Sequence, residues 1–190
     1  MVIGIDYGSK MAGTTVIAYE EDEKVHLICS KKKQDADQMI LDFVETHRPS
    51  LIGLDAPLSL PAVYTDPANH KDYFYRVCDK EVKAMSPMFL GGLTARAIKL
   101  KSQIGSKAQV IEVYPAMAAK LLNLIAFNCK KREADYHQMI SKLTPWVNSP
   151  EIELANAHQF DALLALYISK KFQSGKANLV GLKREGTIVY

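Results

Sequence analysis

The sequence predicts a single α/β domain in which five strands form a mixed sheet flanked by helices. Three strand-like segments follow one another at the start of the chain, and a helix-like segment then precedes a continuous apolar run typical of a buried strand. A fifth strand and several helical segments come after a longer stretch with prolines and polar residues. A length of 190 residues is enough for one domain with a core of its own.

The first three strands are predicted to form an antiparallel meander. Residues 2–6 are an apolar strand, and residues 13–19 are rich in β-branched side chains. The acidic segment 20–23 makes the turn, and residues 24–30 return with apolar side chains at alternate positions.

The middle of the chain predicts a helix, a buried strand and an insertion. Apolar residues at helical spacing over 37–47 predict a helix that ends before Pro49. Residues 51–54 form the fourth strand. Residues 57–107 do not continue a simple alternation of strands and helices, and we expect them to form a cap over the strand ends, with helical stretches around 73–84 and 93–101.

The last third predicts one strand and three helices. Residues 109–113 form the fifth strand, and helical segments follow around 117–124 and 133–143. The final helix is the best marked: Asn156 is a suitable N-cap with Gln159 three residues later, Gly175 is a natural stop, and Lys170 and Lys171 lie in the last turn. Residues 185–190 are expected to add a short edge strand. The absence of repeats, low-complexity segments and linkers predicts one domain over 1–190, with 57–107 as a cap-like insertion.

Four acidic residues stand out because each ends or interrupts an apolar run. Asp6, Asp55 and Glu112 follow the first, fourth and fifth strands, and Asp161 lies within the apolar final helix. Ligands of open α/β sheets bind at the carboxyl ends of strands, so the first three acids converge if those strands run parallel. Asp161 shares a helical stripe with other residues that face the sheet, which predicts that it points inward.

Carboxylates brought together repel one another unless a cation compensates, and Mg²⁺ or Mn²⁺ prefers oxygen ligands. Two such ions roughly 3.5–4 Å apart can promote phosphodiester hydrolysis. This placement predicts a divalent metal site held by Asp6, Asp55 and Asp161, with Glu112 as a fourth catalytic acid. The alternative for each acid is a structural role, as a cap of a neighbouring turn or helix.

Five ordered segments of the chain resemble a family labelled domain of unknown function 429, whose members are described as predicted nucleases of the ribonuclease H-like fold. The segments are Gly4-Ile5-Asp6-Tyr7-Gly8-Ser9, Ile52-Gly53-Leu54-Asp55-Ala56-Pro57-Leu58, Arg76-Val77-Cys78-Asp79-Lys80-Glu81, Glu112-Val113-Tyr114-Pro115-Ala116 and His158-Gln159-Phe160-Asp161-Ala162. The resemblance covers nearly the whole chain. It implies a five-stranded ribonuclease H-like sheet with active acids Asp6, Asp55 and Asp161, and with Glu112 close by.

Further candidates have both a functional and a structural interpretation. Arg76 grips a phosphate in one interpretation and forms a surface ion pair with Asp79, three residues away, in the other. His158, one turn before Asp161, is either a solvated or capping residue or a proton carrier or substrate contact.

Basic and aromatic residues are candidates for nucleic-acid contacts. Lys31–Lys33, residues 130–132, and Arg96 with Lys99 and Lys101 are either phosphate contacts or solvated faces. The aromatic residues of the insertion either stack on bases or are buried beneath it; they are Tyr64, Tyr73, Phe74 and Tyr75.

These patterns together predict a metal-dependent nuclease that acts on a nucleic acid. One alternative is a Mg²⁺-dependent enzyme that binds a nucleotide or phosphometabolite, since Gly4-x-Asp6-x-Gly8 is similar to the phosphate-binding hairpin of actin-like sugar kinases and ATPases. The other is a non-catalytic binding module. Three widely spaced cysteines and no apolar run of roughly 18 residues predict a cytoplasmic protein with reduced, buried thiols and no membrane segment.

Overall fold

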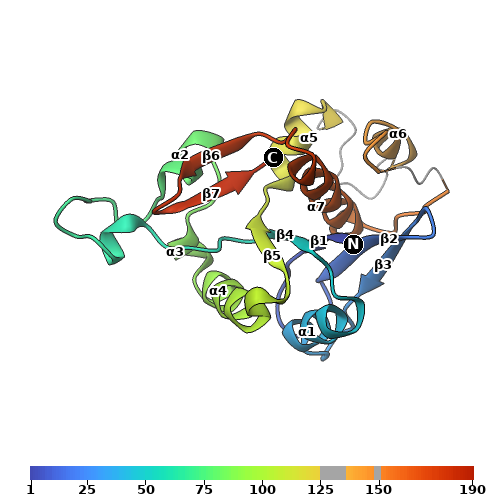
Figure 1. The fold of residues 1–190 in the computed structure, drawn as a ribbon, viewed down its shortest axis with the longest axis horizontal. Helices are drawn as coiled ribbons and strands as arrows, with labels where there is room; N and C mark the ends of the chain where they lie inside the picture. The colour runs from blue at the N-terminus through green and yellow to red at the C-terminus, as the bar shows by residue number, and fades with distance from the viewer. Residues whose placement is uncertain (125–135, 148–150) are drawn as a thin grey trace.

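The computed structural model describes residues 1–124, 136–147 and 151–190, and its centre is a five-stranded sheet (Figure 1). The strand order is β3-β2-β1-β4-β5. The mixed sheet predicted from the sequence is therefore confirmed. The strands are β1 (Val2–Asp6), β2 (Val16–Glu21), β3 (Lys24–Cys29), β4 (Leu51–Asp55) and β5 (Gln109–Glu112).

Strand direction divides the sheet into two halves. β1, β2 and β3 form the expected antiparallel meander, whereas β1, β4 and β5 run parallel. β2 begins at Val16, later than predicted. It continues through Glu21, because Asp22 and Glu23 both have positive φ and form a two-residue hairpin turn. The carboxyl ends of the three parallel strands consequently lie at one edge of the sheet.

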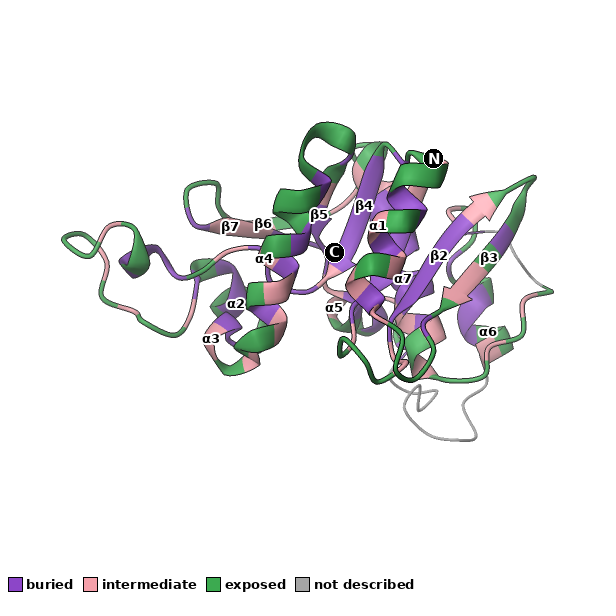
Figure 2. Ribbon diagram, turned by 90° about the horizontal axis from the view of Figure 1, so that it is seen from below, coloured by how far each residue is buried: buried purple, intermediate pink, exposed green. Residues whose placement is uncertain are grey.

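Helices cover both faces of the sheet, as Figure 1 shows. Helix α7 (Ala157–Gln173) packs on one face of β1 and β4, while α1 (Ala36–His47) and α4 (Gly92–Ile104) pack on the other. Figure 2 shows that the central strands between these layers are buried along their length. α4 therefore belongs to the covering layer of the sheet, which corrects the expectation that all of 57–107 forms a cap.

Side-chain alternation assigns each strand position to a face. Ile3 and Ile5 of β1, and Ile52 and Leu54 of β4, belong to the core beneath α1 and α4. The positions between them therefore face α7. Two of those positions are partners in the parallel register, and both are glycine: Gly4 in β1 and Gly53 in β4.

Gly4 and Gly53 allow α7 to lie directly on the sheet. A Cβ at Gly4 would lie 2.0 Å from the backbone nitrogen of Leu166, and one at Gly53 would lie 1.9 Å from the Ser169 hydroxyl. No side chain larger than hydrogen fits between helix and strands at these positions, so the two glycines determine the depth of α7.

The ends of α7 follow the sequence signals. Asn156 Oδ1 accepts from the backbone N–H of Gln159 at 3.1 Å, which confirms the N-cap. The Gln159 side chain accepts from Ala155 N instead of closing the box on Asn156. Gly175, with φ of +72°, follows the last turn as predicted.

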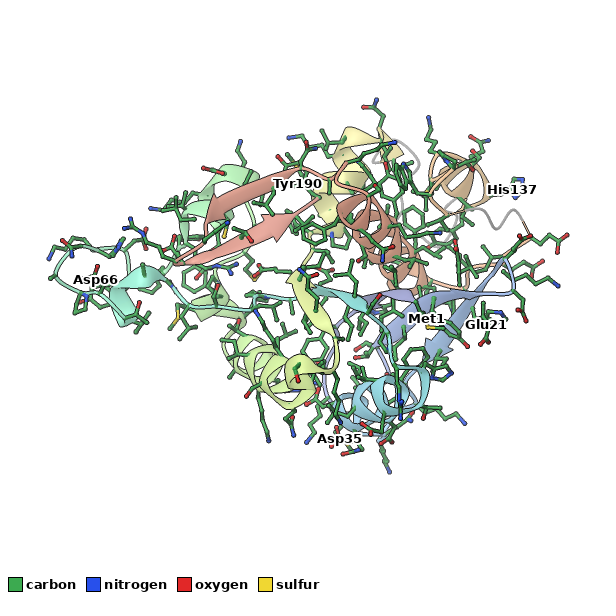
Figure 3. All side chains as sticks on the ribbon, viewed as in Figure 1. Met1, Glu21, Asp35, Asp66, His137 and Tyr190 are labelled. Carbon is green, nitrogen blue, oxygen red and sulfur yellow. The ribbon has the colours of Figure 1, made fainter. Side chains whose placement is uncertain are left out.

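A lobe beside the sheet is built from the segment after β4 and from the end of the chain. It contains η1 (Ala62–Tyr64), α2 (Val77–Val82), α3 (Pro87–Leu90) and the hairpin β6 (Leu179–Leu182) with β7 (Gly186–Val189). Figure 3 shows Asp66 at the end of this lobe farthest from the meander. The predicted edge strand is β7, whereas its partner β6 was not predicted. One isolated parallel bridge, between Val113 and Val189, links β7 to the residue that follows β5.

The remaining described elements are η2 (Gly105–Lys107), α5 (Pro115–Leu121) and α6 (Tyr136–Ser141). The first residues of the helix predicted at 133–143 lie outside the described residues. Cys78 is buried as expected, but Cys29 is exposed; both are free thiols. In the part of the chain that the structure describes, no helix has the length and apolarity needed to cross a membrane.

We predict that Gly4→Ala destabilises the protein, because its Cβ would overlap the backbone of α7. Overpacking at a backbone contact costs about 3 kcal/mol, measured as the free energy of unfolding in urea. Gly92→Ala in α4 is the matched control, because a Cβ there meets nothing within 4 Å. Equal stability of the two variants would contradict the role assigned to Gly4.

Candidate functional site

A cavity of about 800 Å³ opens at the carboxyl ends of the three parallel strands. Its walls come from strand ends, from the helices α4, α5 and α7, and from the lobe. Most of the lining side chains are apolar, and all of the predicted acids also reach it. The lining residues are Asp6, Tyr7, Asp55, Ala56, Pro57, Arg76, Asp79, Ala84, Met85, Leu90, Leu93, Glu112, Val113, Tyr114, Pro115, Ala116, Ala119, Asp161 and Ile188.

Asp6 and Asp55 lie side by side at the ends of β1 and β4. They are direct partners in the parallel register, and both continue the positions of Gly4 and Gly53 on the α7 face. The charge of Asp55 contributes to a raised pKa of Tyr114, after burial as the main cause, so Asp55 also lies near that ring.

Asp161, in the second turn of α7, lies close enough to Asp6 to act on its ionisation. The pKa of Asp6 is raised from 3.8 to about 7, first by burial and then by the negative charge of Asp161. The prediction that Asp161 points inward is confirmed by this interaction and by its place in the cavity lining.

His158 contacts Asp6 directly. Its Nδ1 lies 2.8 Å from Asp6 Oδ2, and the interaction lowers the pKa of Asp6 against the two effects that raise it. The side chain of His158 is 49% exposed, so its ring joins a buried carboxylate to solvent. Of the two sequence interpretations, the geometry favours a contact with the acids over a purely solvated residue.

Glu112 lies on the opposite face from the aspartates. Its register partner is Leu54, whose side chain belongs to the core beneath α1 and α4. Both carboxylate oxygens bind the guanidinium of Arg76, at 2.6 and 2.7 Å, and one of them also accepts from the backbone of Leu58. This pairing favours a structural role for Glu112 over the catalytic role expected from its position after a strand.

Arg76 forms the predicted ion pair with Asp79, but the pair is fully buried and does not lie on the surface. Its Nε and one Nη bind Asp79, both Nη atoms bind Glu112, and one Nη also binds Ser59. These contacts use all five N–H groups of the guanidinium, which leaves no donor for a phosphate.

Glu185, in the turn between β6 and β7, was not predicted to be a site residue, and it joins this hairpin to the rest of the lobe. Its two oxygens accept from the backbone N–H groups of Ala62 and Val77, at 2.9 and 2.8 Å. Local patterns give no signal for this contact, because its partners are more than 100 residues away.

Arg96 braces the loop that follows β1. It binds both oxygens of Asp37, donates to the carbonyl of Gly8 at 3.1 Å and lies over the Tyr7 ring at 4.8 Å. Tyr7 also donates to Asp37 at 2.6 Å. The geometry therefore gives Arg96 a positioning role beside the cavity and supports no direct phosphate contact.

The other basic and aromatic candidates fall into separate groups. Lys31–Lys33 are exposed after β3, and Lys99 and Lys101 are exposed on α4, away from the lining of the cavity. Residues 130–132 lie outside the described residues. Three of the four aromatic candidates are about half exposed, which excludes burial for them; they are Tyr64, Tyr73 and Phe74.

Within residues 1–124, 136–147 and 151–190, no group of three or more His, Cys, Asp or Glu side chains has the spacing of a metal site. Comparisons with family models, curated proteins and solved structures gave no match to this chain. Assignment of a function therefore depends on the chemistry of the cavity.

We predict that Arg76→Met destabilises the protein by about 3–5 kcal/mol, because Glu112 and Asp79 would remain buried without their cation. Urea unfolding measures this loss. Lys80→Met is the control: it removes the exposed ion pair with Asp72 from the same helix and should change stability little. A similar effect of both substitutions would show that the buried network has no special importance.

We also predict a pH-dependent effect of Asp6→Asn. Between the ordinary pKa of 3.8 and the folded value of about 7, the folded state holds a proton that the unfolded chain has released. The wild type therefore loses stability as pH rises through 7, whereas the variant, which cannot ionise, does not.

The stability of Asp6→Asn relative to wild type should consequently rise by about 1–4 kcal/mol between about pH 4.5 and pH 8. Denaturant unfolding at both pH values measures this change. Asp42→Asn, on the exposed side of α1, is the control and should give a constant difference. A constant difference for Asp6→Asn as well would show that Asp6 is not protonated on folding.

Proposed function

We propose that this protein is a metal-dependent nuclease that hydrolyses phosphodiester bonds in a nucleic acid, with a ribonuclease H-like arrangement of its acids. The observation that carries the proposal is the placement of Asp6, Asp55 and Asp161. Two of them are register partners on the α7 face, and the third lies on α7 and raises the pKa of the first.

The chemistry of the donor set suits Mg²⁺ or Mn²⁺, although the three acids do not have the spacing of a metal site in this structure. Carboxylate oxygens are hard ligands, and a cation would offset the burial and repulsion that raise the pKa of Asp6. Asp6, Asp55 and Asp161 would hold the ion. When bound, it would supply an activated water and neutralise charge on the phosphate.

The protein's own groups contribute binding, proton transfer and exclusion of water. His158 is placed to exchange a proton with Asp6 Oδ2, and its exposed side can pass that proton to solvent. Val113, Pro115 and Ala119 give part of the cavity an apolar wall, which would disfavour water there. The pairing of Arg76 with Glu112 fixes the wall opposite the aspartates.

A second candidate is an enzyme that binds a nucleotide or phosphometabolite with one Mg²⁺. The cavity favours it, because a volume of about 800 Å³ with mostly apolar walls is typical of small-molecule sites. Calorimetry with Mg²⁺ and ATP, compared with binding of structured DNA, separates the two candidates. If neither ligand nor Mn²⁺ binds, the protein is a non-catalytic module.

We predict that Asp6→Asn and Asp55→Asn each reduce Mn²⁺-dependent cleavage of a labelled oligonucleotide by at least about 100-fold, because each removes a charged ligand of the ion. Asp161→Asn should reduce it less or equally. Glu81→Gln, an exposed acid of the lobe, is the matched control and should retain activity. Circular dichroism checks that the variants are folded. Full activity of Asp6→Asn and Asp55→Asn would overturn the proposed function.

A further inference from the structure

A cluster of aromatic and apolar side chains is exposed on the lobe next to the cavity. We call Phe74, Tyr75, Met85 and Phe89 the aromatic rim. Phe74 is 52% exposed, Met85 60% and Phe89 63%. Exposed apolar clusters of this kind commonly mark binding sites.

The rings of the aromatic rim contact one another. The centroids of Phe74 and Phe89 are 5.6 Å apart, and those of Tyr75 and Phe89 are 5.9 Å apart with the rings perpendicular. Phe89 therefore connects α3 to the segment that precedes α2, and the rim acts as one surface.

Hydrogen bonds fix the backbone that carries these rings. The carboxylate of Asp72 accepts from the N–H groups of Phe74 and Tyr75, both at 2.8 Å. The hydroxyl of Ser86 donates to the Phe74 carbonyl at 2.5 Å and accepts from the N–H of Met88 at the start of α3. Because the backbone on both sides is fixed, the rings can contact a ligand at little cost in conformational entropy.

The aromatic rim is continuous with the cavity that contains the aspartates. Met85 belongs to both surfaces, and Leu90, which also lines the cavity, directly follows Phe89. We therefore expect a ligand that extends from the aspartates past Met85 to reach the rings.

The chemistry of the two surfaces is complementary to a nucleic-acid strand. With the divalent cation that the proposed function assigns to them, the aspartates would suit the phosphodiester, and aromatic side chains stack on bases of any sequence. A base within a regular duplex has both faces covered by its neighbours, whereas an unpaired base can offer a face to a ring.

We infer that the aromatic rim binds unpaired bases of single-stranded nucleic acid and thereby directs the adjoining phosphodiester to Asp6, Asp55 and Asp161. This inference rests on the proposed function and names its substrate class. It makes the lobe a specificity element that selects single strands over duplex.

Binding of fluorescently labelled oligothymidine tests the inference, with EDTA present so that no cleavage occurs. Wild type should bind the single strand more tightly than a duplex of equal length. The double variant Phe74→Ala/Phe89→Ala should lose roughly 5- to 150-fold in affinity for each base that stacks. Fluorescence anisotropy measures both effects.

Two controls separate stacking from loss of structure. Leu121→Ala in α5 removes a side chain that is 52% exposed but outside the rim, and it should leave affinity unchanged. Phe89→Tyr keeps an aromatic face and should retain affinity. Since both phenylalanines are more than half exposed, the double variant should unfold at nearly the wild-type denaturant concentration.

The outcomes distinguish this inference from the proposed function. Unchanged binding by the double variant, or equal binding of single strand and duplex, would overturn the role of the rim even if Mn²⁺-dependent cleavage is found. Ring-dependent binding of single strands without any cleavage would support the rim and contradict the nuclease assignment.

Discussion

Direct contact between α7 and the two central strands is the constraint on which the rest of the structure depends. Gly4 and Gly53 are register partners, and a methyl group at either would overlap atoms of α7. The helix can therefore lie at a depth that no other pair of residues would permit. Two residues further along each strand, at the same face, are Asp6 and Asp55. The close approach of the helix brings Asp161 to these strand ends. The two glycines therefore determine that Asp161 lies near Asp6 and Asp55.

Two groups of buried charge differ in how completely they are compensated. On one side, Arg76 binds Glu112 and Asp79, and every N–H of its guanidinium is used. The guanidinium of that group has a partner for each N–H, and removal of one partner would leave an uncompensated buried charge. On the other side, burial and the charge of Asp161 raise the pKa of Asp6 to about 7, and His158 acts against this rise. A perturbed carboxylate in a cavity is a typical property of a functional site.

The lobe adjoins the cavity that contains these acids. It is formed by segments from both sides of the sheet-forming region, tied together by Glu185, and it carries exposed aromatic side chains on a hydrogen-bonded backbone. The cavity lies between this lobe and the strand ends. Acids from the sheet and α7 line the cavity, and the rings of the lobe lie on segments that adjoin it. This arrangement is the physical basis for the two proposals, phosphodiester hydrolysis and recognition of unpaired bases.

The sequence by itself determined features that depend on neighbouring residues: apolar runs for β1 and β4, the Asn156 cap, and the strand-end positions of Asp6 and Asp55. The face of Glu112 could not be predicted in this way. That face depends on which residue of β4 is the register partner of Glu112, and Arg76, which pairs with Glu112, lies 36 residues away in the sequence. The strand β6, the burial of Arg76 and the exposure of the rim were likewise decided by tertiary structure. The physical reason is that periodicity and capping are local, whereas register, ion pairing and burial depend on contacts between distant segments.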